Sequence, residues 1–163
     1  MFQSMTYKGT LSEQYNLVTN QLKALIAGEP NTIANLANAS SLLNQFLPDV
    51  NWVGFYLVEG EGLVLGPFQG MPACVRIPSG KGVCGTSLEK KQTIRVSNVH
   101  DFPGHIACDA ASQSEIVIPL IVHGRIFAVL DIDSPQLNRF TEEEQIHLEQ
   151  FVNELAKGIE CSN

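Results

Sequence analysis

Three cysteines in the glycine- and proline-rich middle of the chain, Cys74, Cys84 and Cys108, are the residues best suited to chemistry. Residues 1–10 have neither the basic start nor the continuous apolar stretch of a secretory signal, so we expect a cytoplasmic protein. In that compartment cysteines more often perform redox chemistry or bind metal than form structural disulfides. The fourth cysteine, Cys161, falls in a polar tail, and we interpret it as incidental.

Three carboxylates downstream of these cysteines are predicted to share one pocket. Asp131 and Asp133 alternate in the sequence LDID, and the period of two places both on the same face of a strand. Glu115 begins the neighbouring predicted strand, and a hairpin through His123-Gly124 brings it beside them. Like charges so close require a cation or raised pKa values, which suits a site that binds an amino group and donates a proton. Solvated charges at a strand end are the alternative interpretation.

An aromatic pair precedes the cysteines. Trp52 and Tyr56 are four residues apart on one predicted strand, so they lie on the same face. Such rings could form one wall of a binding pocket, although a plain role in the core is the competing interpretation.

Zinc is the main competing explanation for the cysteines. Together with His100 and His105 they could supply four ligands, but none of them is paired at the short spacing that structural zinc sites use. We therefore expect no bound metal. The two histidines are interpreted as loop residues, either of which could orient or deprotonate Cys108.

Composition limits the classes of function. The 163 residues, 44% hydrophobic and 17% charged, are typical of one globular domain over 1–163, with a core of about 11–158 and a short polar tail at 159–163. The net charge of −7 argues against a nucleic-acid partner, whose phosphates require clustered cations. No apolar run is long enough to cross a membrane.

Helical periodicity appears at both ends of the chain. Helices are predicted over Thr10 to Ala27, from a cap at Asn31 or Thr32 to Leu47, and after Thr141, which is followed by three glutamates. The residues expected to be buried in the second and last helices are Ile33, Leu36, Ala37, Leu42, Leu43, Phe46, Leu47, Ile146, Leu148, Phe151, Val152 and Leu155.

The period changes to that of strands between these helices. Strands are predicted over Trp52 to Val58, Leu63 to Phe68, Ile94 to Ser97, Ile116 to Val122 and Arg125 to Ile132. Pro119 is expected at a bulge or an edge. This order of elements predicts an α+β fold, a central antiparallel sheet with the N-terminal and C-terminal helices packed mainly on one face.

A glycine-rich segment links the two groups of strands. Gly80, Gly82 and Gly85 match the spacing G-x-G-x-x-G, but no strand is predicted to run directly into it and no parallel βαβ unit surrounds it. We interpret it as a turn that opens a short helix from Val83 to Lys91, whose backbone N–H groups could receive a substrate carboxylate.

Several segments resemble a known family: NWVGFYL (51–57), GPFQGMPACVRIPSGKGVCGTS (66–87), FPGHIACDAASQSEIVIPL (102–120) and VLDIDSP (129–135). They resemble a stand-alone GAF domain, and more narrowly the free methionine-(R)-sulfoxide reductases. The resemblance covers about Leu11 to Glu154. It implies that the chain is a single GAF domain that reduces free L-methionine (R)-S-oxide to L-methionine and serves in defence against oxidative stress.

The resemblance also implies roles for the cysteines. Cys108 is expected to be the nucleophile, Cys74 its direct resolving partner, and Cys84 a second relay thiol, linked through sulfenic acid and disulfide intermediates. Thioredoxin, supplied ultimately by NADPH, is the expected reductant. No bound cofactor is expected, and a homodimer is an expectation from similarity.

The pocket residues follow in the same way. Trp52, Tyr56, Glu115, Asp131 and Asp133 are expected to contact the substrate, and Asp131 or Asp133 to donate the proton. The alternative is a GAF module without catalysis that senses a small molecule or a redox state. Catalytic consumption of reductant distinguishes the two.

Overall fold

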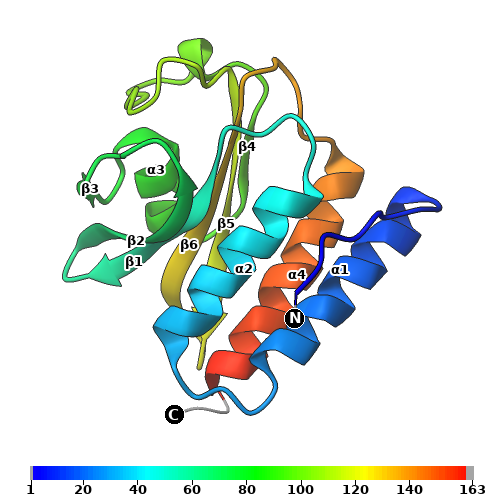
Figure 1. The fold of residues 1–163 in the computed structure, drawn as a ribbon. Coiled ribbons are helices and arrows are strands. Elements are labelled where there is room, and N and C mark those ends of the chain that lie inside the picture. The colour runs from blue at the N-terminus through cyan, green and yellow to red at the C-terminus, as the bar shows by residue number, and fades with distance from the viewer. Residues whose placement is uncertain (1, 161–163) are drawn as a thin grey trace.

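The computed structural model describes residues 2–160, which form helices around one antiparallel sheet (Figure 1). In chain order the elements are α1 (Leu11–Ile26), α2 (Thr32–Phe46), β1 (Trp52–Glu59), β2 (Gly62–Gly70), β3 (Arg76–Pro78), α3 (Gly82–Lys90), β4 (Ile94–Val96), the 3-10 helix η1 (Val99–Asp101), β5 (Ser114–Val122), β6 (Arg125–Ser134) and α4 (Glu142–Glu160). The strand order is β3-β2-β1-β6-β5-β4, and each neighbouring pair is antiparallel.

The helices are divided unequally between the two faces of the sheet. α1, α2 and α4 lie side by side, with α2 against β1 and β2 and α4 against β5 (Figure 1). α3 packs on β5 and β6 from the other side. The predicted α+β class, with the terminal helices mainly on one face, is confirmed.

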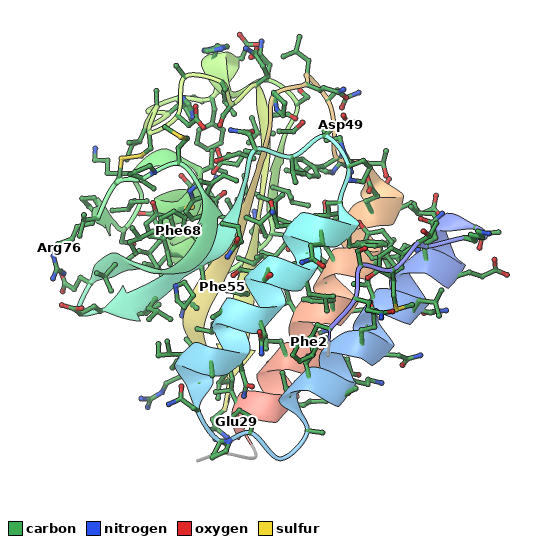
Figure 2. All side chains as sticks on the ribbon, in the orientation of Figure 1. Phe2, Glu29, Asp49, Phe55, Phe68 and Arg76 are labelled. Carbon is green, nitrogen blue, oxygen red and sulfur yellow. A yellow bond between two sulfur atoms is a disulfide. The ribbon has the colours of Figure 1, made fainter. Side chains whose placement is uncertain are left out.

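Two hydrophobic clusters fill the spaces on either side of the sheet. Val53 and Phe55 of β1 point into the larger cluster under the three long helices, whereas Trp52 and Tyr56 belong to the smaller cluster under α3. Phe55 and Phe68, labelled in Figure 2, lie in these two different layers. Because side chains alternate along a strand, β1 contributes side chains to the cluster under the long helices and also to the cluster under α3.

The long helices begin where side-chain caps are available. Thr10 and Glu13 form a reciprocal capping box at α1, and the side chain of Asn31 accepts from the backbone N–H of Ala34 in α2. The hydroxyl of Thr141 accepts from the backbone N–H of Glu144. Each cap satisfies backbone donors that the helix itself leaves unpaired.

Three residues expected to be buried in helices are exposed. Ile33 is 53% exposed, and Ala37, one turn later on the same flank of α2, is also exposed. The buried stripe of α2 runs along the adjacent flank through Leu36 and Leu43. Ile146 is 51% exposed because it lies on the opposite side of α4 from Leu148 and its buried neighbours. The apolar stripe of each helix is therefore narrower than predicted.

Two further boundaries differ from the prediction. The strand β3 runs directly into the glycine-rich segment, although it is an antiparallel edge strand on β2 and builds no βαβ unit. α4 continues through Ile159, which is fully buried, so the chain is still helical where the polar tail was expected to begin. Cys161 lies outside the described residues.

Pro119 occupies a position that tolerates the missing N–H. It pairs with Val129 of β6, beside a register irregularity at Leu120, and lies beyond the last β4 pairing at Val117. Within residues 2–160, no helix combines the length and the apolar character needed to cross a membrane.

Candidate active site

One pocket lies between the sheet, the start of α3 and the loop that follows η1. Seven of the eight predicted site residues line it, namely Trp52, Tyr56, Cys84, Cys108, Glu115, Asp131 and Asp133. Its volume is about 40 Å³, which is enough for a few water molecules but not for an amino acid the size of methionine. The eighth residue, Cys74, is bonded to the pocket's edge through a disulfide.

The disulfide joins Cys74 and Cys108, which are 34 residues apart, with their Cα atoms separated by 5.8 Å (Figure 2). It links the segment after β2 to the loop before β5. Cys108 is exposed and Cys74 is half-buried. This pairing is the one that the family resemblance implies, and its exposure leaves it open to an external thiol.

The three acids converge through the strand register. Glu115 of β5 lies opposite Asp133 of β6, and Asp133 in turn lies opposite Trp52 of β1. Asp131, two residues before Asp133, shares its face, and it lies opposite Gly54. Glu115 and Asp131 are each only 6% exposed. None of the ion pairs among residues 2–160 involves any of these acids.

Burial controls the protonation of this cluster. It raises the pKa of Glu115 well above its usual range, and the charges of Asp131 and Asp133 raise it further. The pKa of Asp133 is also raised by burial, with the charge of Asp131 adding to the effect. Burial raises the pKa of Asp131 too, although the neighbouring proton donors Glu115 and Cys84 oppose this. The raised pKa values favour the protonated forms of these carboxyl groups, and a protonated carboxyl group can donate a proton to a ligand.

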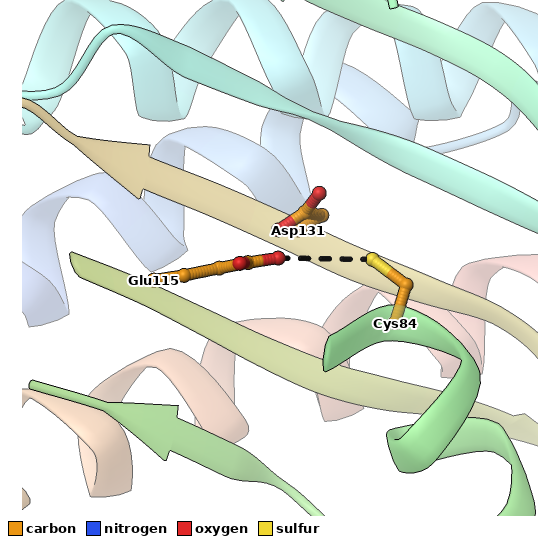
Figure 3. A group of neighbouring side chains, drawn as sticks. All are labelled: Cys84, Glu115 and Asp131. Carbon is orange, nitrogen blue, oxygen red and sulfur yellow. Dashed lines mark hydrogen bonds between the residues drawn. The ribbon is translucent and has the colours of Figure 1, made fainter. Parts of the chain in front are cut away.

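Cys84 sits in the first turn of α3 and faces the acids. Its Sγ lies 4.0 Å from Oε1 of Glu115, to which it donates a weak hydrogen bond (Figure 3). Burial raises the pKa of this thiol well above its usual value, and the charges of Asp131 and Glu115 raise it further. Cys84 is thus a buried neutral thiol that an external protein cannot reach directly.

The aromatic side chains connect the pocket to the segment that carries Cys74. The indole N–H of Trp52 donates to the carbonyl of Met71 (3.1 Å), and the hydroxyl of Tyr56 donates to the carbonyl of Cys74 (2.9 Å). The rings of Trp52 and Tyr56 are stacked with centroids 5.8 Å apart. The aromatic wall and the disulfide segment therefore form one hydrogen-bonded unit.

Positive charge enters the pocket at the start of α3. Lys81, Gly82 and Val83 line it, and Lys81 at the N-cap makes no side-chain capping bond. The N-terminus of a helix offers free N–H groups and the positive end of the dipole. This part of the pocket suits a carboxylate, while the acids suit an ammonium group.

Comparisons with known proteins agree with this geometry. The sequence model of the GAF domain matches residues 32–159. The chain is 55% identical to the free methionine-R-sulfoxide reductase of Escherichia coli over 148 residues, covering 91% of this chain and 90% of that one.

Solved structures show the same relationship. The free methionine-R-sulfoxide reductase of Neisseria meningitidis in complex with its substrate superposes with a TM-score of 0.93 at 41% identity, covering 99% of this chain and 98% of that one. The reduced form of the Staphylococcus aureus enzyme gives 0.88 at 50% identity, with 95% and 99% covered. The chain belongs to the free methionine-R-sulfoxide reductase family of GAF domains.

Two residues of this family member that shape the site were not predicted from its sequence. Asn51, just before β1, donates through Nδ2 to Asp109 (3.0 Å) and to Ser112 (3.1 Å), which holds the Cys108 loop against the sheet. Gly54 leaves room for the indole, because a Cβ there would lie 2.7 Å from Cη2 of Trp52. The sequence signals that could have identified them are a side-chain amide just before a strand and a glycine within that strand.

The two histidines differ in position relative to the pocket of this reductase family member. His105 lines the pocket, and burial lowers its pKa, with the charge of His100 lowering it further. Neutral His105 can accept a proton at the mouth of the pocket. His100 is exposed and is not among the lining residues, so the five residues considered as alternative zinc ligands do not gather at one point.

Proposed function

We propose that the protein reduces free L-methionine (R)-S-oxide to L-methionine, with the Cys108 thiolate as nucleophile. The observation that carries this proposal is the Cys74–Cys108 disulfide at the edge of a pocket that also contains three buried acids with raised pKa values and an aromatic wall. A thiol, a proton donor and a resolving thiol are what sulfoxide reduction by cysteine needs.

The two ends of a free amino acid match the charges of opposite parts of the pocket, which must widen from its volume of about 40 Å³ to admit the substrate. The ammonium group is placed at Glu115, Asp131 and Asp133, and the S-methyl group against Trp52 and Tyr56. The carboxylate is placed at the α3 N-terminus. A peptide-bound residue lacks both terminal charges, so the site selects the free amino acid.

The chemistry begins with attack of the Cys108 sulfur on the substrate sulfur. Asp131 or Asp133 protonates the sulfoxide oxygen as its bond to sulfur breaks. The protonated oxygen moves to the Cys108 sulfur as the bond between the two sulfurs breaks. Methionine therefore leaves with its sulfur reduced by two electrons, and Cys108 becomes a sulfenic acid. The thiol of Cys74 then attacks this sulfur, water is released, and the disulfide forms. No bound metal or organic cofactor takes part.

Regeneration requires an external dithiol, for which we propose thioredoxin, reduced in turn by NADPH. Thiol exchange at the exposed Cys108 would release the Cys74 thiol and restore the enzyme. The buried position of Cys84 supports an internal relay or a ligand-binding role rather than direct contact with thioredoxin. We also propose a cytoplasmic location and a homodimer; the latter rests on the family resemblance.

A single-turnover experiment with cysteine variants tests this function. After reduction and removal of reductant, Cys108→Ser should form no methionine, whereas Cys74→Ser should release about one methionine per site and then stall as a sulfenic acid. Cys161→Ser is the control and should behave as the parent. A sensing module would form the disulfide but release no methionine, and exchanged phenotypes would exchange the roles of Cys74 and Cys108.

A further inference from the structure

Three side chains inside the pocket form a compact group of potential metal ligands. Sγ of Cys84 and one carboxylate oxygen each of Glu115 and Asp131 all lie within 4.8 Å of one another. They come from α3, β5 and β6, and Figure 3 shows them directed toward one another. This set of one sulfur and two oxygens differs from the cysteine and histidine set that the sequence suggested.

A second observation indicates that the group lacks a ligand. Oδ1 of Asp131 is buried and has no hydrogen-bond partner among the described residues. Nearby Asp133 and Tyr56 add no positive charge, and the basic side chains of the pocket, Lys81 and His105, make no ion pair with these acids. A buried acceptor without a partner is costly, and a cation would satisfy it.

We infer that Cys84, Glu115 and Asp131 bind a thiophilic divalent cation such as Zn²⁺, and that this ion inhibits the enzyme by occupying the substrate's place. The inhibition rests on the proposed function, whereas the binding of the metal ion does not. The ion is not a cofactor, because it would take the same oxygen atoms that the substrate ammonium needs.

Binding of the metal ion releases protons from its ligands. Zn²⁺ binds thiolate and carboxylate at about 2.0–2.3 Å, which places tetrahedral ligand atoms roughly 3.5 Å apart. The three atoms therefore need to close by about 1 Å, which side-chain rotation can supply. The ion displaces the proton of the Cys84 thiol and those held by the acids. Water takes the fourth position.

Co²⁺ is a suitable probe because a cobalt–thiolate bond produces a charge-transfer absorption band. We would titrate the disulfide form of Cys161→Ser, in which Cys84 is the remaining thiol. The band should appear, should be lost in Cys161→Ser/Cys84→Ala, and should require at least about tenfold more Co²⁺ in Glu115→Gln. Exposed Glu61 provides the control, and Glu61→Gln should leave the titration unchanged.

The outcomes separate the metal site from the proposed function. A band that persists without Cys84, or no band in the parent, overturns the inference. Melting curves show whether the Cys84→Ala variant folds. If it does not, the Co²⁺ titration of Glu115→Gln, which keeps the thiol, tests the metal site instead. With reduced enzyme, Zn²⁺ should slow the single turnover, and excess methionine sulfoxide should relieve the effect. Normal turnover without a Co²⁺ band would contradict the metal site alone. A Co²⁺ band in a protein without turnover would contradict the proposed function and the inhibition.

Discussion

The hydroxyl of Tyr56 donates a 2.9 Å hydrogen bond to the main-chain carbonyl of Cys74. It thereby joins a residue of the pocket wall to the backbone of the cysteine that is bonded to Cys108. The contact orients the Cys74 segment with respect to the ring that is placed against the substrate. The binding wall and the resolving thiol are thus mechanically connected.

Removal of this hydroxyl should affect resolution more than the first chemical step. Tyr56→Phe retains the ring but loses a hydrogen bond worth about 1 kcal/mol, so we expect disulfide formation after the first turnover to slow roughly fivefold. Rapid quenching followed by thiol counting measures that rate. Tyr7→Phe, which loses a hydroxyl far from the pocket, is the control. Equal slowing of methionine release and disulfide formation would contradict a specific role in resolution.

The buried acids should make the stability of the protein fall as the pH rises. The pKa of Glu115 is raised in the folded state by burial and by its acidic neighbours. The contribution of Glu115 to the free energy of unfolding is therefore complete below the pKa that this group has in the unfolded chain. It is lost as the pH rises through the pKa that the group has in the folded protein. Glu115→Gln removes this loss, so we expect it to melt about 2–4 °C above the parent at pH 8.

The same comparison at low pH provides the control for Glu115. Near pH 4 both side chains are neutral, and the difference between the two melting temperatures should disappear. Glu61→Gln, at an exposed turn, should match the parent at both pH values. A Glu115→Gln variant that is less stable than the parent at pH 8 would show that the ionised carboxylate stabilises the fold.

Amide substitution of the two aspartates tests the proton donor. Asp131→Asn and Asp133→Asn keep the shape nearly constant but remove acidity and charge, so each should lower kcat/KM at least about tenfold. The donor should lose mainly kcat, and an acid that only holds the ammonium should lose mainly affinity. Since the donor works in its protonated form, activity should decline as the pH rises through its raised pKa. Near-parental kinetics in both variants would place the pocket elsewhere.

The convergence of the acids was predictable because period-two alternation and one short hairpin determine it. Asp131, Asp133 and Glu115 needed only the pleat and the His123-Gly124 turn to be placed together. The long helices were predictable from their apolar spacing and caps, although the width of each buried stripe was not, because it depends on neighbours that the helix sequence does not contain.

The remaining features depend on contacts that leave no pattern in the sequence. β3 has three residues and ends in proline, so its pairing with β2 gives no periodic signal. The acceptor of the Tyr56 hydroxyl is a backbone carbonyl, which any residue would provide. Asn51 binds Asp109 across 58 positions, and only the folded chain brings them together.

The stereochemistry of turnover on racemic free methionine sulfoxide decides whether the protein reduces the free R epimer alone. With thioredoxin, thioredoxin reductase and NADPH in excess, chiral analysis of the exhausted mixture should show half of the sulfoxide consumed, all of it the R epimer. N-acetylated methionine sulfoxide, which lacks the ammonium group placed at the acids, should react poorly in parallel. Consumption of both epimers, or equal rates with the N-acetylated compound, would contradict the account.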